Sequence, residues 1–296
     1  MVECRSGGFI LGLIFLACKV MGQAGLAPAE EVVEYAGPIR PKLIADHSTV
    51  QAGGKFTLGV LFEIEKPWHI YWKYPGEAGL PTRIEFILPA GFSAGVLEWP
   101  IPEEFRQPGD LPGYGYKDEV LLFQEFVAPK VLAAGVEIRF LVNVHWLGCA
   151  DVCVPGNATL ELKLPVSKEA VPAKREVFEK WRKLSPQRVL PAEAPFLIST
   201  SGKPSGFGHA ADLSVRIEWQ VTPKMADCFL IPPQGLKLEG ISKHTAGNVT
   251  TVRFKAIPLR VKDSDIAVSS YEFEGLIAYQ DDRSIRRGFY VLLKFR

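Results

Sequence analysis

The chain has 296 residues, with 34 Lys or Arg against 33 Asp or Glu, so its formal net charge at pH 7 is +1. This balance argues against a nucleic-acid partner, because a nucleic-acid-binding domain carries a basic stripe. A hydrophobic content of 47% with 23% charged residues is that of a globular protein and excludes a disordered chain. At about 100–200 residues per domain, the length predicts two domains.

Residues 1–29 have the features of a signal peptide. Arg5 precedes an uncharged stretch, residues 6–18, that is too short to span a bilayer. The small-residue pattern Ala27-Pro28-Ala29 follows, and cleavage after it leaves an exported protein. The alternative is a lipoprotein anchored at Cys18, but the residues before that cysteine match a lipidation signal poorly. No later segment has the length and apolarity of a membrane span.

Residues 30–166 are predicted to form an antiparallel β-sandwich. Apolar residues alternate with polar or small ones along 56–64, 136–146 and 160–164, which is the pattern of strands with one buried face. In the first of these strands, Thr57 and Gly59 belong to the opposite face and are expected to be less buried. Turn signals separate the strands at short intervals, as in a sandwich.

A helix and a linker, residues 167–209, are predicted to join this domain to a second one. Val177, Phe178, Trp181 and Leu184 recur at helical spacing among charged residues, which predicts an amphipathic helix within 168–184 that packs on a sandwich. The Pro-, Ser- and Gly-rich stretch 185–209 has the composition of a linker. Residues 210–296 are predicted to form a second all-β domain, with strands at 213–221, 236–241, 249–257, 268–279 and 288–295.

Three cysteines remain after the signal peptide is removed: Cys149, Cys153 and Cys228. In an oxidising compartment, a close pair plus one extra cysteine suggests one disulfide and one free or buried thiol. Along a continued strand Cys149 and Cys153 would lie about 13 Å apart, so a disulfide between them requires residues 150–152 to form a turn. Strand alternation places Cys149 opposite the apolar face, on the less buried side.

Three interpretations of this cysteine segment stay open at the residue level. A small, exposed disulfide is more easily reduced and suits redox exchange, whereas the same bond could be a static staple. A tetrahedral metal site from His145, Cys149, Cys153 and Cys228 is the third, but C-x3-C is not the usual zinc spacing, and neither a metal nor another cofactor is predicted.

The neighbours of the cysteine pair add two expectations. Asp151 lies between the cysteines, where its charge would raise the pKa of a thiol or steer protons during exchange. His145 lies about 13 Å along the strand from Cys149 and is not expected to act as its base. Cys228, beside Phe229 and Leu230, is predicted to be a buried thiol.

Several motifs, taken in order, resemble the N-terminal periplasmic domain of DsbD-type thiol:disulfide interchange proteins, including the ScsB-like branch. The resemblance covers about residues 30–166, and the second domain, around 225–230, resembles the extra sandwich of ScsB-like proteins. The motifs are PWHIYWKYPGEAGLPT at 67–82, LPAGF at 88–92, Trp99-Pro100, Tyr114-Gly115-Tyr116 and CADVCVPG at 149–156.

The resemblance implies a fold and an activity. The fold would be all-β, with immunoglobulin-like antiparallel sandwiches, and the chain a thiol:disulfide oxidoreductase of the protein-disulfide reductase type. Its cysteine pair would carry electrons from a membrane-embedded redox protein to a periplasmic disulfide isomerase or another thioredoxin-like protein. Cys153 would form the mixed disulfide and Cys149 would resolve it.

The resemblance also implies a cap over the cysteines. Residues 105–116 occupy the place of the family's cap loop, in which Phe105 or Tyr114 could supply the covering ring, with Tyr116 as a further supporting residue. The aromatic stretch 68–74 is instead expected to serve core and edge packing.

The sequence departs from the longer family members, because it contains neither a multi-span membrane domain nor a thioredoxin domain. Electrons would then come from a separate membrane protein. The C-x3-C spacing is also shorter than in the best-known branch. The alternative function is a non-catalytic binding or assembly module in which Cys149 and Cys153 form a permanent staple.

Overall fold

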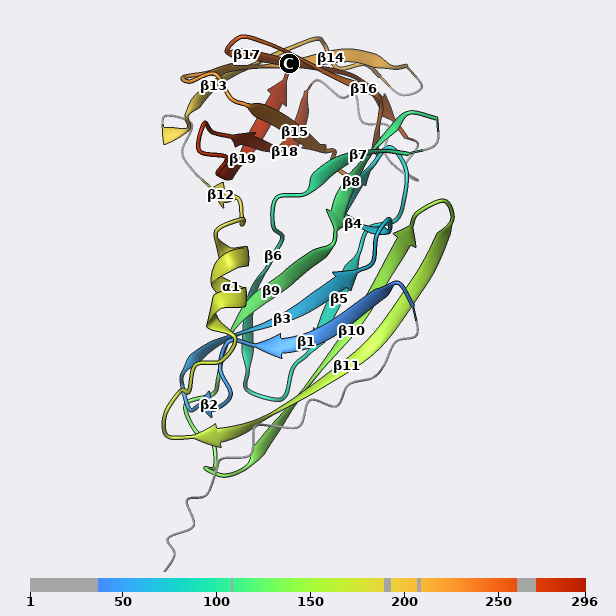
Figure 1. Cartoon of the computed structure of the whole chain (residues 1–296). Helices are drawn as coiled ribbons and strands as arrows, with labels where there is room; N and C mark the ends of the chain where they lie inside the picture. The colour runs from blue at the N-terminus through green and yellow to red at the C-terminus, as the bar shows by residue number, and fades with distance from the viewer. Residues whose placement is uncertain (1–36, 108, 189–192, 207–208, 260–269) are drawn as a thin grey trace, which may run out of the picture.

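The computed structural model describes residues 37–107, 109–188, 193–206, 209–259 and 270–296. Within these ranges the chain forms strands β1–β19 and one α-helix, α1, which confirms the predicted all-β class. The strands build two immunoglobulin-like sandwich units, which Figure 1 shows in blue to yellow-green and in yellow to red. We call β1–β11 the N-terminal unit and β12–β19 the C-terminal unit. The predicted signal peptide lies outside the described residues.

The N-terminal unit consists of two sheets whose strand pairs are antiparallel, apart from a short parallel pairing of β2 with β11. The first sheet contains, in spatial order, β1 (Ile39–Ala45), β3 (Lys55–Ile64), β9 (Glu119–Val127) and β6 (Ser93–Glu98). The second contains β2 (Val50–Gln51), β11 (Cys153–Ser167), β10 (Glu137–Cys149), β4 (His69–Gly76), β8 (Leu111–Lys117) and β7 (Glu103–Gln107), with β5 (Arg83–Ile87) paired to β10.

The core between these sheets follows from the alternation in β3 and β10. Phe56 and Phe62 of β3 point toward the second sheet, where their ring centroids lie 5.4 Å from Phe140 and 6.0 Å from Trp146. Side chains of one strand that point the same way recur every second residue. The predicted apolar face of each strand is therefore the face that meets the other sheet.

The opposite face of β3 differs from the prediction, because it is also buried. Thr57 is only 4% exposed, and Gly59 is buried as well. A Cβ at Gly59 would lie 2.6 Å from the Cδ1 of Leu121, so glycine leaves the space that its neighbours on β9 fill. Strand alternation predicts which side chains share a face, but not whether another element covers that face.

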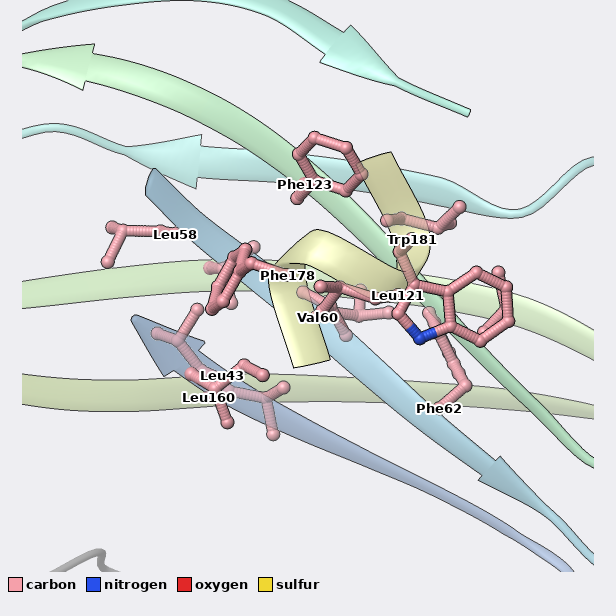
Figure 2. Packing of buried hydrophobic residues seen from close by; sticks show 14 of the residues in the cluster. Leu43, Leu58, Val60, Phe62, Leu121, Phe123, Leu160, Phe178 and Trp181 are labelled. Atoms are coloured by element: carbon pink, nitrogen blue, oxygen red, sulfur yellow. The ribbon is translucent and has the colours of Figure 1, made fainter. Parts of the chain in front are cut away.

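The covering element is helix α1 (Arg175–Arg182), which presents Phe178 and Trp181 to this sheet. Figure 2 shows both rings over this sheet, and the Phe178 centroid lies 6.3 Å from that of Phe123. The amphipathic helix packed on a sandwich is therefore confirmed. As a helix of only eight residues it depends on this packing more than on its own propensity.

The helix is shorter than the predicted range 168–184 because its first residues bond elsewhere. The backbone N–H of Ser48 donates to the carbonyl of Val171, and that of Ala173 donates to the carbonyl of Asp46. These bonds hold residues 171–173 in an extended path along the end of β1. Helical backbone geometry begins only after them.

The C-terminal unit is a smaller sandwich of two four-stranded sheets. The predicted linker 185–209 contains two strands, and one of them, β13, pairs along its length with β14. The strand β15, which holds Cys228, was not recognised from the sequence. One sheet contains β12 (Gln187–Arg188), β19 (Arg286–Phe295), β18 (Tyr271–Gln280) and β15 (Met225–Ile231), and the other contains β13 (Phe196–Ser201), β14 (Ala211–Trp219), β17 (Val249–Pro258) and β16 (Leu236–Ala246).

The two units share buried apolar residues. Phe229 of β15 belongs to the same buried cluster as Trp72 and Tyr114 of the N-terminal unit. Its ring centroid lies 5.9 Å from Trp72 and 5.0 Å from Tyr114, both in edge-to-face contact. Figure 1 shows the C-terminal unit at the end of the N-terminal unit where β4, β7 and β8 lie. Among the described residues, no helix has the length and apolarity needed to cross a membrane.

Candidate functional site

Strands β10 and β11 form a long hairpin with the two cysteines at its tip. Cys149 and Cys153 are the last paired residues of the hairpin register and are joined by a disulfide, with their Cα atoms 4.1 Å apart. Ala150 to Val152 form the connecting turn, in which the N–H of Ala150 donates to the carbonyl of Val152 at 3.0 Å. The turn required for pairing is therefore present.

The two cysteines differ in their exposure. Cys153 is exposed, and the flanking Val152 and Val154 are 62% and 52% exposed. Cys149 is only 2% exposed, so the expectation that it lies on the less buried side of the strand is wrong. Tyr71 of β4 and Phe105 of β7 pack against it, together with Leu147. An incoming thiolate has access to the Cys153 end of the bond.

Tyr71 brings a hydroxyl group to the buried sulfur. This hydroxyl lies 3.4 Å from the Sγ of Cys149 and 2.7 Å from the Oε1 of Gln107 on β7, and its single proton can serve only one of these acceptors at a time. Gln107 in turn donates from Nε2 to the carbonyl of Ala78 at 3.2 Å. Burial raises the pKa of Tyr71, so the hydroxyl stays protonated at neutral pH.

His69 is the direct cross-strand partner of Cys149. Its ring centroid lies 4.0 Å from that of Phe105 and 5.3 Å from that of Tyr71. Burial lowers the pKa of His69 to about 4, with a smaller contribution from the charge of Lys117. At neutral pH the imidazole is uncharged, and its buried Nε2 has no hydrogen-bond partner in the described part of the chain.

His69 and Tyr71 lie in the aromatic stretch that the sequence assigned to packing. The strand has two faces, and Ile70 and Trp72 on the other face do belong to the hydrophobic core. The alternation along 69–72 contains the signal for this division. It does not show which face meets the cysteines, because that depends on the pairing of β4 with β10.

Of the residues proposed to support the site, the structure brings only Phe105 into contact with Cys149. Tyr114 is buried against Phe229 of the C-terminal unit. The hydroxyl of Tyr116 donates to the carbonyl of Pro100 at 2.8 Å. Asp151 lies exposed in the turn between the cysteines. Strands β7 and β8 pair as a β-hairpin, and Phe105 of β7 packs on the buried Cys149.

The four residues of the metal-site alternative do not come together in the structure. Cys149 and Cys153 are bonded to each other, and His145 is exposed on β10. Cys228 is a free, buried cysteine in β15, as predicted, and burial raises its pKa to about 12. Nowhere in the described residues do three or more His, Cys, Asp or Glu side chains gather in a group that could hold a metal ion.

Comparison with protein families matches residues 40–165 to the family described as thiol:disulfide interchange protein DsbD, N-terminal. The matched range includes both cysteines and every residue found around Cys149. A comparison with curated proteins found no match. The cysteine hairpin therefore lies within the part of the chain that matches this family.

Among solved structures, the chain is similar to the N-terminal periplasmic domain of ScsB from Proteus mirabilis. The TM-score is 0.63 at 18% identity, with 86% of this chain and 93% of that chain covered, so both units share its fold. A protein of unknown function from Porphyromonas gingivalis W83 has a TM-score of 0.24 at 10% identity, covering 86% of this chain and 99% of that one. The Enterococcus faecalis MSCRAMM ACE has 0.23 at 11%, covering 88% and 95%. These two scores are too low to support an argument.

Proposed function

We propose that the protein relays electrons in the periplasm through Cys149 and Cys153, since residues 40–165 match the DsbD N-terminal family. It accepts them from a membrane redox protein and passes them to a disulfide isomerase or another thioredoxin-like protein. The observation that carries this proposal is the unequal exposure of the two cysteine residues. One end of the bond is open to a partner, whereas the other is enclosed by Tyr71 and Phe105.

In the first half of the relay the protein is reduced. A thiolate of the donor attacks the Sγ of Cys153, the bond to Cys149 breaks, and Cys149 leaves as a thiolate. The second donor thiolate then attacks its own partner sulfur in the mixed disulfide and releases Cys153. Two electrons have moved from the donor, which is left with a disulfide, to the cysteine pair.

The second half reverses these roles. The Cys153 thiolate attacks a disulfide of the acceptor and forms a mixed disulfide, while one acceptor sulfur leaves as a thiolate. Cys149 then attacks the Sγ of Cys153, which restores the internal disulfide and releases the acceptor as a dithiol. The hydroxyl of Tyr71, placed 3.4 Å from the Sγ of Cys149, can donate to the thiolate in both halves. Such a hydrogen bond favours the thiolate over the thiol.

Redox equilibration of the mature protein in graded glutathione buffers tests the proposal. Alkylation followed by peptide mass analysis counts free thiols at Cys149, Cys153 and Cys228 separately. We expect reversible opening of the disulfide at a potential above about −300 mV, since structural disulfides usually lie lower. A bond that resists reduction until the protein unfolds would contradict the proposed relay. The binding or assembly module with a structural disulfide would then be the better account.

Single-cysteine variants assign the two roles. In Cys149→Ser the exposed Cys153 is expected to form a mixed disulfide with oxidised glutathione rapidly. In Cys153→Ser the remaining Cys149, which is enclosed, is expected to react much more slowly. Cys228→Ser is the matched control and should equilibrate like the unaltered protein. Equal rates in the first two variants would contradict the assignment of Cys153 as the attacked sulfur.

A further inference from the structure

We propose that the C-terminal unit holds the β7 strand closed over Cys149, with Lys243 and Asp227 as positioning residues for exchange. We call this contact of the C-terminal unit with β7 the clamp, and its geometry rests on contacts between the units. Its consequence for electron transfer rests on the proposed function.

The strand β7 has two occupied faces. Phe105 and Gln107 point to the site, where they meet Cys149 and the hydroxyl of Tyr71. Glu104, between them in sequence, points the opposite way and accepts a hydrogen bond from the Nζ of Lys243 on β16 at 3.2 Å. Since successive side chains of a strand alternate between its faces, what holds Glu104 also fixes where Phe105 lies.

A buried carboxylate holds the two basic side chains that contact this strand and the residue before it. Asp227 of β15 is 5% exposed and accepts hydrogen bonds from Lys243 and from Arg286 of β19. Arg286 also donates to the carbonyl of Pro102, the residue just before β7, at 2.6 Å. Burial by itself would lower the pKa of Lys243, but Asp227 and Glu104 outweigh it and raise the pKa above its ordinary value. Lys243 is therefore charged at neutral pH.

The two strands of the hairpin are held in different ways. Tyr114 of β8 packs its buried ring against Phe229 in the shared core. The contact at β7 is ionic, and it surrounds a pocket of about 560 Å³ lined by Glu104, Phe105, Asp227, Lys243 and Arg286 among others. Partly exposed ion pairs contribute much less to stability than apolar core packing does. Without the ionic contact β7 would be held by its pairing with β8, so β7 could shift while the packing of Tyr114 keeps β8 in place.

A shift of β7 would change how the buried sulfur is covered. Phe105 lies against Cys149 and His69, so a shift or twist of β7 would move this ring relative to them. In the resolving step Cys149 attacks the Sγ of Cys153 beneath this ring, so the position of β7 acts on that step. The strength of the ionic contact would set how often the site is open without a partner.

The test compares Lys243→Met with Lys237→Met in the full chain. Lys237 lies on the same strand, but its ion pair with Glu239 is exposed and does not involve β7. In the oxidised protein we expect hydrogen exchange of the amides of residues 103–107 to increase about fivefold in Lys243→Met and to stay unchanged in Lys237→Met. Lys243→Arg keeps the charge and should restore most of the protection.

Alkylation of the reduced protein provides a readout that simple destabilisation would not give. In Lys243→Met the rate at Cys149 should rise relative to Cys153, while Cys228 stays protected. A parallel rise at Cys149 and Cys228 would mean general loosening and would overturn the clamp, as would amide exchange of 103–107 equal to that of Lys237→Met. The hydrogen-exchange measurement needs no redox turnover. It therefore tests the clamp independently of the reversible reduction that tests the relay.

Discussion

At the scale of single residues, the site depends on which residues of the aromatic stretch 68–74 face the disulfide. His69 and Tyr71 face the disulfide, whereas Ile70 and Trp72 face the core. A histidine kept neutral beside an aromatic ring has a direct consequence for stability. The unfolded chain takes up a proton near pH 6.5 and the folded chain only near pH 4. Between these values the unfolded state binds more protons, so stability falls as the pH falls.

We therefore expect His69→Phe to remove part of the acid sensitivity. Phenylalanine fills similar space and does not titrate. Between pH 7 and pH 4.5 the variant should therefore lose about 2 kcal/mol less unfolding free energy than the unaltered chain does. Urea unfolding at the two pH values measures this difference. His145→Phe, at an exposed position on β10, is the control and should not change the pH dependence. Parallel losses in all three proteins would contradict a buried, neutral His69.

At the scale of elements, the connection of α1 to the first sheet depends on Asp46 at the end of β1. Its carboxylate accepts from the N–H of Thr57 at 2.7 Å and from the guanidinium of Arg182 at 2.8 Å, and it also contacts His47. Burial would raise the pKa of Asp46, but these hydrogen bonds together lower it below its ordinary value of 3.8. Their stabilising effect is present above that pH and is lost as the pH falls below it.

Removing this carboxylate should loosen the helix. Asp46→Ala leaves the N–H of Thr57 buried without an acceptor, and we expect a loss of about 2–3 kcal/mol in unfolding free energy at pH 7. Glu119→Ala is the matched control, because it removes the exposed ion pair with Lys180 on the same helix. That variant should lose less than about 1 kcal/mol. Equal losses measured by denaturant unfolding would show that the buried carboxylate has no special role.

At the scale of the whole molecule, the two units are joined by a shared core as well as by the ionic contact at β7. Phe229, Leu276 and Ala278 of the C-terminal unit belong to the same buried cluster as the core of the N-terminal unit. Apolar burial of this kind couples unfolding of the parts, because separating them exposes the rings of Trp72 and Tyr114 to water.

We therefore expect the full chain to unfold in a single calorimetric transition. Phe229→Ala should remove about 3–5 kcal/mol of stability and split the transition, because the contact between the units is lost. Phe254→Ala, in the separate core of the C-terminal unit, should lower the temperature of the single transition without splitting it, because the contact with Trp72 and Tyr114 stays intact. Two transitions in the unaltered protein would contradict the coupling.

The amino-acid sequence by itself determined the features that depend on near neighbours. Period-two alternation gave the all-β class and the core faces of β3 and β10, and helical spacing gave the buried side of α1. The spacing of the two cysteines required a turn at residues 150–152 if they were to pair. These signals are local, because side-chain direction repeats every few residues. The tertiary structure decided which faces are covered and what surrounds Cys149. Tyr71 is 78 residues away from it in the chain, and Lys243 is 139 residues away from Glu104. Strand pairing and the contact between units create such neighbours, and no local period of the sequence encodes them.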